Sequence, residues 1–287
     1  MSLELNARQR AMLQEMGVHV WLPGPAFAIE GEGAGAEALP PVAQRSAVAG
    51  RPVRQPAIAG AVAVPVSQAR PVTGTPLPAN SLQLQDLDWR GLAETANDCQ
   101  ACGLCAGRKQ STLSPPAQAG QADWFVVGDA PDDDEDQSGT PFAGDAGVLL
   151  ANMLKAMGAR QGEPGSAGAY VTNVVKCRPP VGRLPQAAEL AQCAGYLQRE
   201  LALVQPKVIL AMGRFAIQLL LSEHPDQVSL PLGKQRGAVY RYQGLPVVVT
   251  YAPKVLLRAS ADKGKAWADL CLALDVRDGI ALSTIDP

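Results

Sequence analysis

Apolar strands that alternate with helices constrain the fold of this chain more than any other feature. The expected strands are short and apolar, and they cover 124–127, 170–174, 207–212, 238–242 and 246–251. The expected helices lie between or beside them, over 88–97, 147–157, 186–204, 214–221 and 259–274. Alternation of this kind favours a mostly parallel sheet with helices on both faces. The predicted fold class is therefore α/β, a three-layer sandwich around a central, mostly parallel sheet.

Composition divides the chain into three parts. Residues 1–22 contain a short helical pattern followed by an extended apolar segment. Residues 23–83 hold ten of the 24 prolines, mixed with Gly, Ala, Ser and Val, and show no stable period. Such a segment cannot bury enough apolar surface to offset its ordering entropy, so a disordered linker is predicted. Residues 84–287 are predicted to form the α/β domain.

Charge and hydropathy indicate a cytoplasmic protein. The formal net charge is −2 and the pI about 5.8, so any contact with nucleic acid must use local basic patches. No apolar run reaches the length of a membrane span, and the first residues lack the basic and apolar regions of a secretory signal. Six cysteines in a cytoplasmic protein point to metal or redox chemistry before disulfides.

Four of the cysteines have spacing suited to a shared centre. Cys99 and Cys102 form a Cys-x-x-Cys pair, Cys177 follows a strand, and Cys193 lies sixteen residues later on a helix. Thiolates select zinc or iron–sulfur over hard metals. Unrelated buried cysteines are the alternative, because free cysteine is among the most buried residue types. Of the other two, Cys105 is interpreted as a spare and Cys271 as a core residue.

Three segments are expected beyond the carboxyl ends of the strands, where parallel sheets form their sites. They cover 128–136, 173–180 and 252–258. The acidic run 132–136 is interpreted as a solvated loop in preference to a magnesium site. Basic residues in the segments are expected to contact DNA phosphates without reading sequence, chiefly Arg178, Lys254 and Arg258.

Ordered motifs from Cys99 to Arg258 resemble the family 4, iron–sulfur type of the uracil-DNA glycosylase superfamily. The family's CxxCxL, GEAPGxxED, GxPFxGxAGxLL and YxTNVVKCRPP motifs have counterparts in the same order. In this chain they begin at Cys99, Gly128, Gly139 and Tyr170. The resemblance implies a glycosylase-like fold and a [4Fe-4S] cluster on Cys99, Cys102, Cys177 and Cys193. It also implies DNA as the partner and removal of uracil as the activity.

The resemblance also assigns roles to single residues. A glycosylase must take the base out of the stack and hold it in a pocket. Phe142 matches the aromatic that stacks on the base, and Asn173 matches the side chain that reads its edge. Gly128 belongs to the same substrate-binding segment. Asp129 stands where the family has the Glu of GEAPG, which positions water or stabilises the sugar cation.

Two positions depart strongly from the family pattern. Where the family has His-Pro-Ser, this chain reads Ala252-Pro-Lys254, and Asp132 replaces the last Gly of GEAPG. Ala252 cannot donate a hydrogen bond to the leaving uracil. Loss of such a donor costs about 2.7–4 kcal/mol of transition-state stabilisation. The first hypothesis is therefore a uracil-DNA glycosylase of weakened activity.

The N-terminal part supports a second hypothesis. Residues 12–21 resemble, over a short stretch, the amino-terminal peptide of the psi subunit of the bacterial DNA polymerase III clamp-loader assembly. Psi subunits share a glycosylase-like fold without catalysis. An amphipathic helix with an aromatic anchor on a long tether suits capture by a partner groove. The alternative function is thus an inactive, psi-like adaptor of the clamp loader that binds through residues 1–22.

We predict that a peptide of residues 1–26 binds the clamp-loader core unaided. Trp21→Ala should weaken this binding by about 2 kcal/mol or more, because aromatic residues dominate such interfaces. Isothermal calorimetry measures both affinities, with residues 84–287 alone as the control that should not bind. Absence of binding at high micromolar peptide would remove the support for the adaptor hypothesis.

Overall fold

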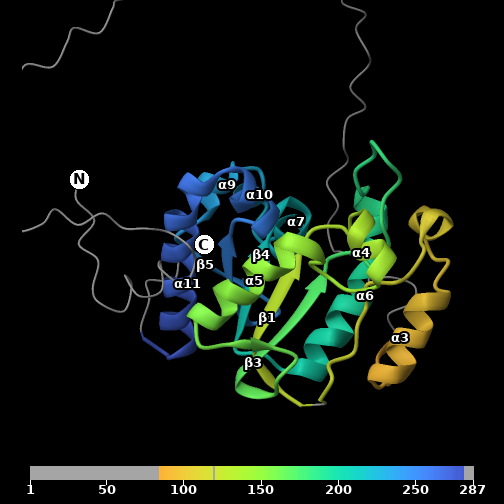
Figure 1. Ribbon diagram of the computed structural model, residues 1–287, viewed down its shortest axis with the longest axis horizontal. Coiled ribbons are helices and arrows are strands. Elements are labelled where there is room, and N and C mark those ends of the chain that lie inside the picture. The colour runs from red at the N-terminus through yellow and green to blue at the C-terminus, as the bar shows by residue number, and fades with distance from the viewer. Residues whose placement is uncertain (1–83, 119, 281–287) are drawn as a thin grey trace, which may run out of the picture. The chain divides into compact units, whose positions relative to one another are not determined.

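One sheet of six strands forms the centre of the protein, in the order β2-β3-β1-β4-β6-β5 (Figure 1). The computed structural model describes residues 84–118 and 120–280. The strands are β1 (Ala122–Gly128), β2 (Arg160–Gln161), β3 (Gly165–Asn173), β4 (Val208–Met212), β5 (Val239–Tyr242) and β6 (Leu245–Thr250). All neighbouring pairs are parallel except β5 and β6, which are antiparallel.

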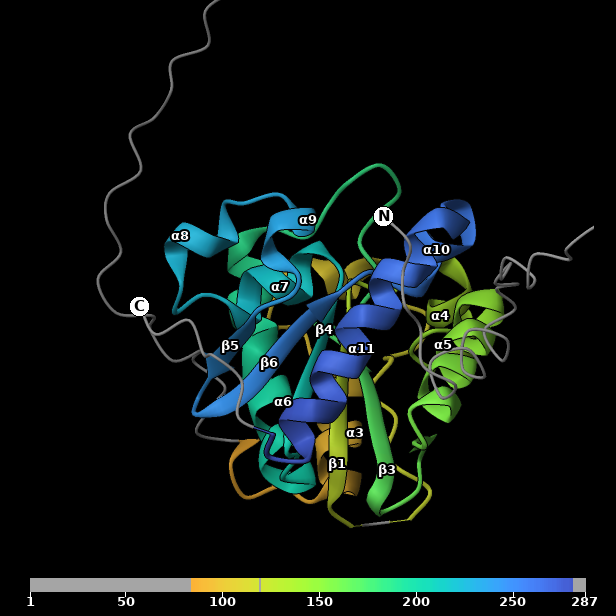
Figure 2. The same ribbon diagram turned by 90° about the vertical axis from the view of Figure 1, so that its left-hand side faces the viewer.

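Helices cover both faces of this sheet (Figure 2). The longer ones are α3 (Trp89–Asp98), α5 (Gly144–Ala156), α6 (Ala187–Val204), α7 (Arg214–Leu220) and α11 (Lys263–Arg277). The shorter ones are α4 (Asp133–Ser138), α8 (Pro225–Val228), α9 (Leu232–Gln235), α10 (Pro253–Arg258) and the 3-10 turns Gly103–Gly107 and Ser260–Asp262. The α/β sandwich predicted from the sequence is confirmed.

Side chains of β1 alternate between two apolar clusters, one on each face of the sheet. Phe125 and Val127 join the cluster under α3, α6 and α7, whereas Trp124 and Val126 join the cluster under α5, α10 and α11. All four side chains are fully buried, because a parallel strand between two helical layers has no face toward water. This double burial explains why the strands read as continuous apolar runs.

Most predicted elements lie within a few residues of the observed ones, but two site segments were interpreted wrongly. The acidic run is the helix α4 and not a solvated loop, and residues 253–258 form the helix α10. The predicted N-terminal helix and the linker 23–83 lie outside the described residues. Among the helices that are described, none combines the length and apolar character that crossing a membrane requires.

A buried ion pair joins the segment after β3 to α6. The Lys176 ammonium lies 2.7 Å from Glu200, and both side chains are almost completely buried. The other Glu200 oxygen accepts hydrogen bonds from Tyr170 and Thr172, at 3.0 Å each. Lys176 also donates to the Asn173 carbonyl at 2.8 Å, so the network fixes the chain where β3 ends.

Lys176→Met should lower the free energy of unfolding by about 3–5 kcal/mol, because it leaves the buried Glu200 carboxylate without a cation. The double variant Lys176→Met with Glu200→Gln should lose less. The neutral glutamine that replaces Glu200 has an amide oxygen that can still accept hydrogen bonds from Tyr170 and Thr172. Denaturant titration followed by circular dichroism measures both. Equal losses in the single and double variants would contradict this account.

Candidate functional site

The carboxyl ends of the central strands bring two predicted site residues side by side. Gly128 at the end of β1 is the register partner of Asn173 at the end of β3. Ala252 follows the end of β6, which reaches the same edge through β4. Gly128, Asn173 and Ala252 therefore lie at the carboxyl ends of the strands, where the sequence predicted the site segments.

Phe142 packs directly on Gly128. A Cβ atom added to Gly128 would lie 2.4 Å from Cζ of the Phe142 ring, so only glycine allows this approach. Phe142 is a non-glycine residue with positive φ, 55°, and its amide donates to Glu135 Oε1 at 2.6 Å. This hydrogen bond helps to hold an otherwise unfavourable backbone conformation.

Asn173 is buried, and hydrogen bonds fix the orientation of its amide. Nδ2 donates to the Asp129 carbonyl at 2.9 Å and to Glu135 Oε1 at 3.1 Å. Oδ1 is buried without a hydrogen-bond partner in the described structure. Both N–H groups are thus committed, and the oxygen is the atom that remains for a ligand.

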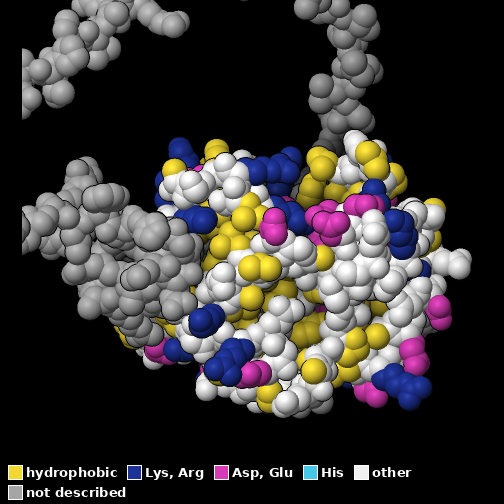
Figure 3. All heavy atoms as spheres, in the orientation of Figure 1, with side chains coloured by type: hydrophobic (Ala, Val, Ile, Leu, Met, Phe, Trp, Pro, Cys, Tyr) yellow, Lys and Arg dark blue, Asp and Glu magenta, His cyan; other side chains and the backbone are white. Residues whose placement is uncertain are grey.

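Glu135 connects these residues, although the sequence interpretation placed it in a solvated loop. It lies in α4, where Asp132 caps the helix and the Glu135 side chain accepts from the Asp132 amide at 2.9 Å. Glu135 is only 1% exposed and Asp136 is fully buried. The Asp-x-x-Glu spacing of a capping box was a signal in the sequence for this helix. In Figure 3, acidic side chains gather over α4 with basic side chains beside them.

Lys254 spans from α10 to α4. Its Nζ lies 2.6 Å from Asp132 Oδ2 and 2.6 Å from Glu135 Oε2. Burial disfavours the charged form of Lys254, but hydrogen bonds to Asp132 and Glu135 outweigh burial and raise the pKa of the ammonium group. Burial of Asp132 is likewise outweighed by Lys254, and the pKa of this carboxyl is lowered. Both charges are therefore present at neutral pH.

Asp129 caps helix α7. Its carboxylate accepts from the amides of Phe215 at 2.7 Å, Arg214 at 3.1 Å and Ala216 at 3.4 Å. Burial raises the pKa of Asp129, and the amide donors and Lys254 act in the opposite direction. These three contacts hold both carboxylate oxygens against the first amides of α7.

The other predicted residues near the site differ in accessibility. Ala252 precedes α10 and makes no side-chain capping bond. Arg178, predicted to contact DNA, pairs with Asp133 and is only 22% exposed. Arg258 is exposed, and no ion pair or hydrogen bond involves it within 84–118 and 120–280. Of the three predicted phosphate contacts, Arg258 alone is unengaged in this part of the chain.

Four predicted cysteine ligands gather beside α6. Cys177 and Cys193 are buried in the apolar cluster, and Cys99 and Cys102 pack against it. The Arg108 guanidinium donates to Cys177 Sγ at 3.2 Å and to the Cys99 carbonyl at 3.1 Å. Electrostatic interactions link Cys177 with Cys99 and Cys102, and Cys193 with Cys177 and Cys102. All six cysteines are free thiols.

Burial of the thiols opposes their ionisation, whereas the hydrogen bond from Arg108 to Cys177 favours a thiolate. Burial raises the pKa of Cys102 and Cys177, and raises the pKa of Cys193 to about 12, so metal coordination would be needed to stabilise their charged forms. No three His, Cys, Asp or Glu side chains within 84–118 and 120–280 form a group that could hold a metal ion. A four-iron cluster is larger than one ion, so its ligands need only surround a common volume.

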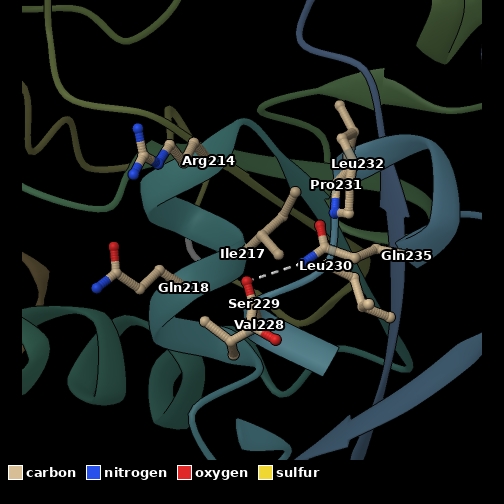
Figure 4. Close-up of a pocket in the computed structure, with 9 residues that line it drawn as sticks. All are labelled: Arg214, Ile217, Gln218, Val228, Ser229, Leu230, Pro231, Leu232 and Gln235. Atoms are coloured by element: carbon tan, nitrogen blue, oxygen red, sulfur yellow. Dashed lines mark hydrogen bonds between the residues drawn. The ribbon is translucent and has the colours of Figure 1, made fainter. Parts of the chain in front are cut away.

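A cavity of about 540 Å³ lies between α7 and the α8–α9 segment (Figure 4). Neither the cysteines nor Phe142 and Asn173 line it. Ile217, Leu230 and Leu232 contribute apolar lining, and Gln235 Nε2 donates to the Val228 carbonyl at 3.3 Å. None of the residues predicted from the sequence as ligands or substrate contacts lines it.

The sequence of the domain matches a known superfamily. The family described as the uracil DNA glycosylase superfamily matches residues 115–271, and the chain belongs to it. Within the superfamily, its similarity extends over most of the length of type-4 members. It is 34% identical over 190 residues to the type-4 uracil-DNA glycosylase of Pyrobaculum aerophilum, spanning 65% of this chain and 93% of the relative. Identity to the type-4 uracil-DNA glycosylase of Archaeoglobus fulgidus is also 34%, over 58% of this chain and 83% of the relative.

Proposed function

We propose that the protein removes uracil from DNA by hydrolysing the N-glycosidic bond, as a cytoplasmic repair enzyme of reduced activity. The observation that carries this proposal is the pairing of Phe142 with Asn173. An aromatic side chain packs on Gly128, and the buried Asn173 Oδ1 beside it lacks a partner in the described structure. Membership of the superfamily and the type-4 names of the relatives support the same activity.

In this proposal the uracil leaves the base stack and enters the pocket. The Phe142 ring stacks on it, and Asn173 Oδ1 accepts the N–H of the uracil ring. Arg258, exposed on α10, contacts a DNA phosphate. When the bond to the sugar breaks, negative charge remains on the uracil. The Ala252 side chain has no hydrogen-bond donor, which lowers the rate by about 10²–10³ relative to a site with a side-chain donor.

We further propose that Cys99, Cys102, Cys177 and Cys193 hold a [4Fe-4S] cluster. The four residues come from the end of α3, the turn after it, the segment after β3 and helix α6. The bound cluster would supply iron–thiolate bonds that tie these segments together. Arg108 would stabilise the anionic Cys177 ligand through the hydrogen bond that it already makes.

An adaptor without catalysis is the second candidate function. Two observations favour it: Ala252 lacks the donor of the family motif, and Asp129 is committed to capping α7. In that case the domain would be a scaffold, and residues 1–22, which lie outside the described structure, would bind the clamp loader.

Cys177→Ser should abolish iron binding and lower stability, because serine is a poor ligand for iron–sulfur clusters. Cys105→Ser is the matched control and should leave the iron content unchanged. Iron and zinc analysis after anaerobic purification measures the result, together with visible absorption. Stoichiometric zinc without iron in the wild-type protein would contradict the cluster.

Ala252→His should raise uracil excision by about 10²-fold, because it restores a hydrogen-bond donor to the leaving uracil. Ala252→Leu adds bulk without a donor and should give no increase. Single-turnover excision from uracil-containing single-stranded DNA measures these rates. Asn173→Ala should abolish the activity in either background. If the histidine variant were no faster than the leucine variant, Ala252 would not explain a weakened activity.

A further inference from the structure

Two charged residues from distant parts of the chain contact each other. Asp132 caps α4, and Lys254 lies in α10, 122 positions away in the chain. Their charged atoms lie 2.6 Å apart. This ion pair connects two segments of the proposed site.

The same lysine reaches the base pocket through Glu135. Lys254 Nζ donates to Glu135 Oε2, while Glu135 Oε1 accepts from Asn173 Nδ2 at 3.1 Å and from the Phe142 amide at 2.6 Å. Among the donors recorded for this carboxylate, Lys254 is the one that carries a positive charge. Because an unpaired buried carboxylate is costly, Lys254 supplies the cation that this side chain needs.

The two acceptors around Nδ2 decide which way the Asn173 amide points. They are the Glu135 carboxylate and the Asp129 carbonyl. Rotation of the amide by 180° would place Oδ1 against these two acceptors. Lys254 holds the Glu135 side chain in place, so its loss would free the carboxylate to move and would permit the rotated form.

We propose that Lys254 is a positioning residue for base specificity, which acts through Glu135 to hold Asn173 Oδ1 toward the bound base. This inference rests on the proposed function. The pocket then takes bases that present a ring N–H at this edge. Uracil has such an N–H, and cytosine has a bare nitrogen acceptor at the same position, so deamination creates the group that the site requires.

The test uses the full-length holo-protein and the variants Lys254→Met and Lys254→Arg. Lys207→Met is the control, because Lys207 pairs with Asp123 at the opposite, amino-terminal edge of the sheet. Fluorescence anisotropy measures affinity for single-stranded DNA with one uracil or one cytosine at the same position. Lys254→Met should reduce the uracil-to-cytosine affinity ratio about tenfold, as expected when a buried amide is no longer held in the pairing orientation. The arginine and control variants should keep the wild-type ratio.

A second measurement reports on the Asn173 amide itself. Its side-chain resonances, assigned by their loss in Asn173→Asp, should show slow hydrogen exchange in the wild type and faster exchange in Lys254→Met and Glu135→Gln. Unchanged exchange and an unchanged affinity ratio in Lys254→Met would overturn the role of Lys254, while the wild-type uracil preference would leave the proposed function standing. A wild type with slow exchange but no uracil preference would instead overturn the proposed function and the inference with it.

Discussion

A buried carboxylate needs hydrogen-bond donors from the protein itself, and Glu135 accepts hydrogen bonds from four groups. Its partners are the Asp132 amide, the Phe142 amide, the Asn173 side chain and the Lys254 ammonium. These groups belong to the start of α4, the segment before α5, the end of β3 and helix α10. The proposed base-binding site therefore depends on one buried carboxylate, and the ends of the parallel strands support it.

The sheet could be predicted from the sequence because its strands are buried on both faces. Trp124 to Val127 read as one apolar run, and a parallel sheet requires the carboxyl-terminal residues of its strands, such as Gly128 and Asn173, to lie at the same end. Short helices in the site could not be predicted in this way. The charged α4 has no apolar face of its own, and α10 is a single short segment whose burial of Leu256 depends on the packed domain.

Family motifs identified which positions matter, but contacts decided what several of them do. Asp129 has the expected kind of side chain, yet its oxygens hold the amides at the start of α7. Lys254 was predicted to contact DNA phosphates, and in the structure its ammonium group also pairs with Asp132 and Glu135. Such changes cannot be read from residue type, because each depends on a partner more than 80 positions away in sequence. The positions of the cysteines were easier to predict. Cys99 follows a helix, Cys177 follows a strand, and Cys193 lies on a helix.

The ion pairs of Lys254 make its two carboxylate partners unequal to it. Without Asp132, the lysine would still be paired with Glu135. Without Lys254, the two carboxylates would face each other with no cation between them. The cluster therefore tolerates loss of the aspartate better than loss of the lysine.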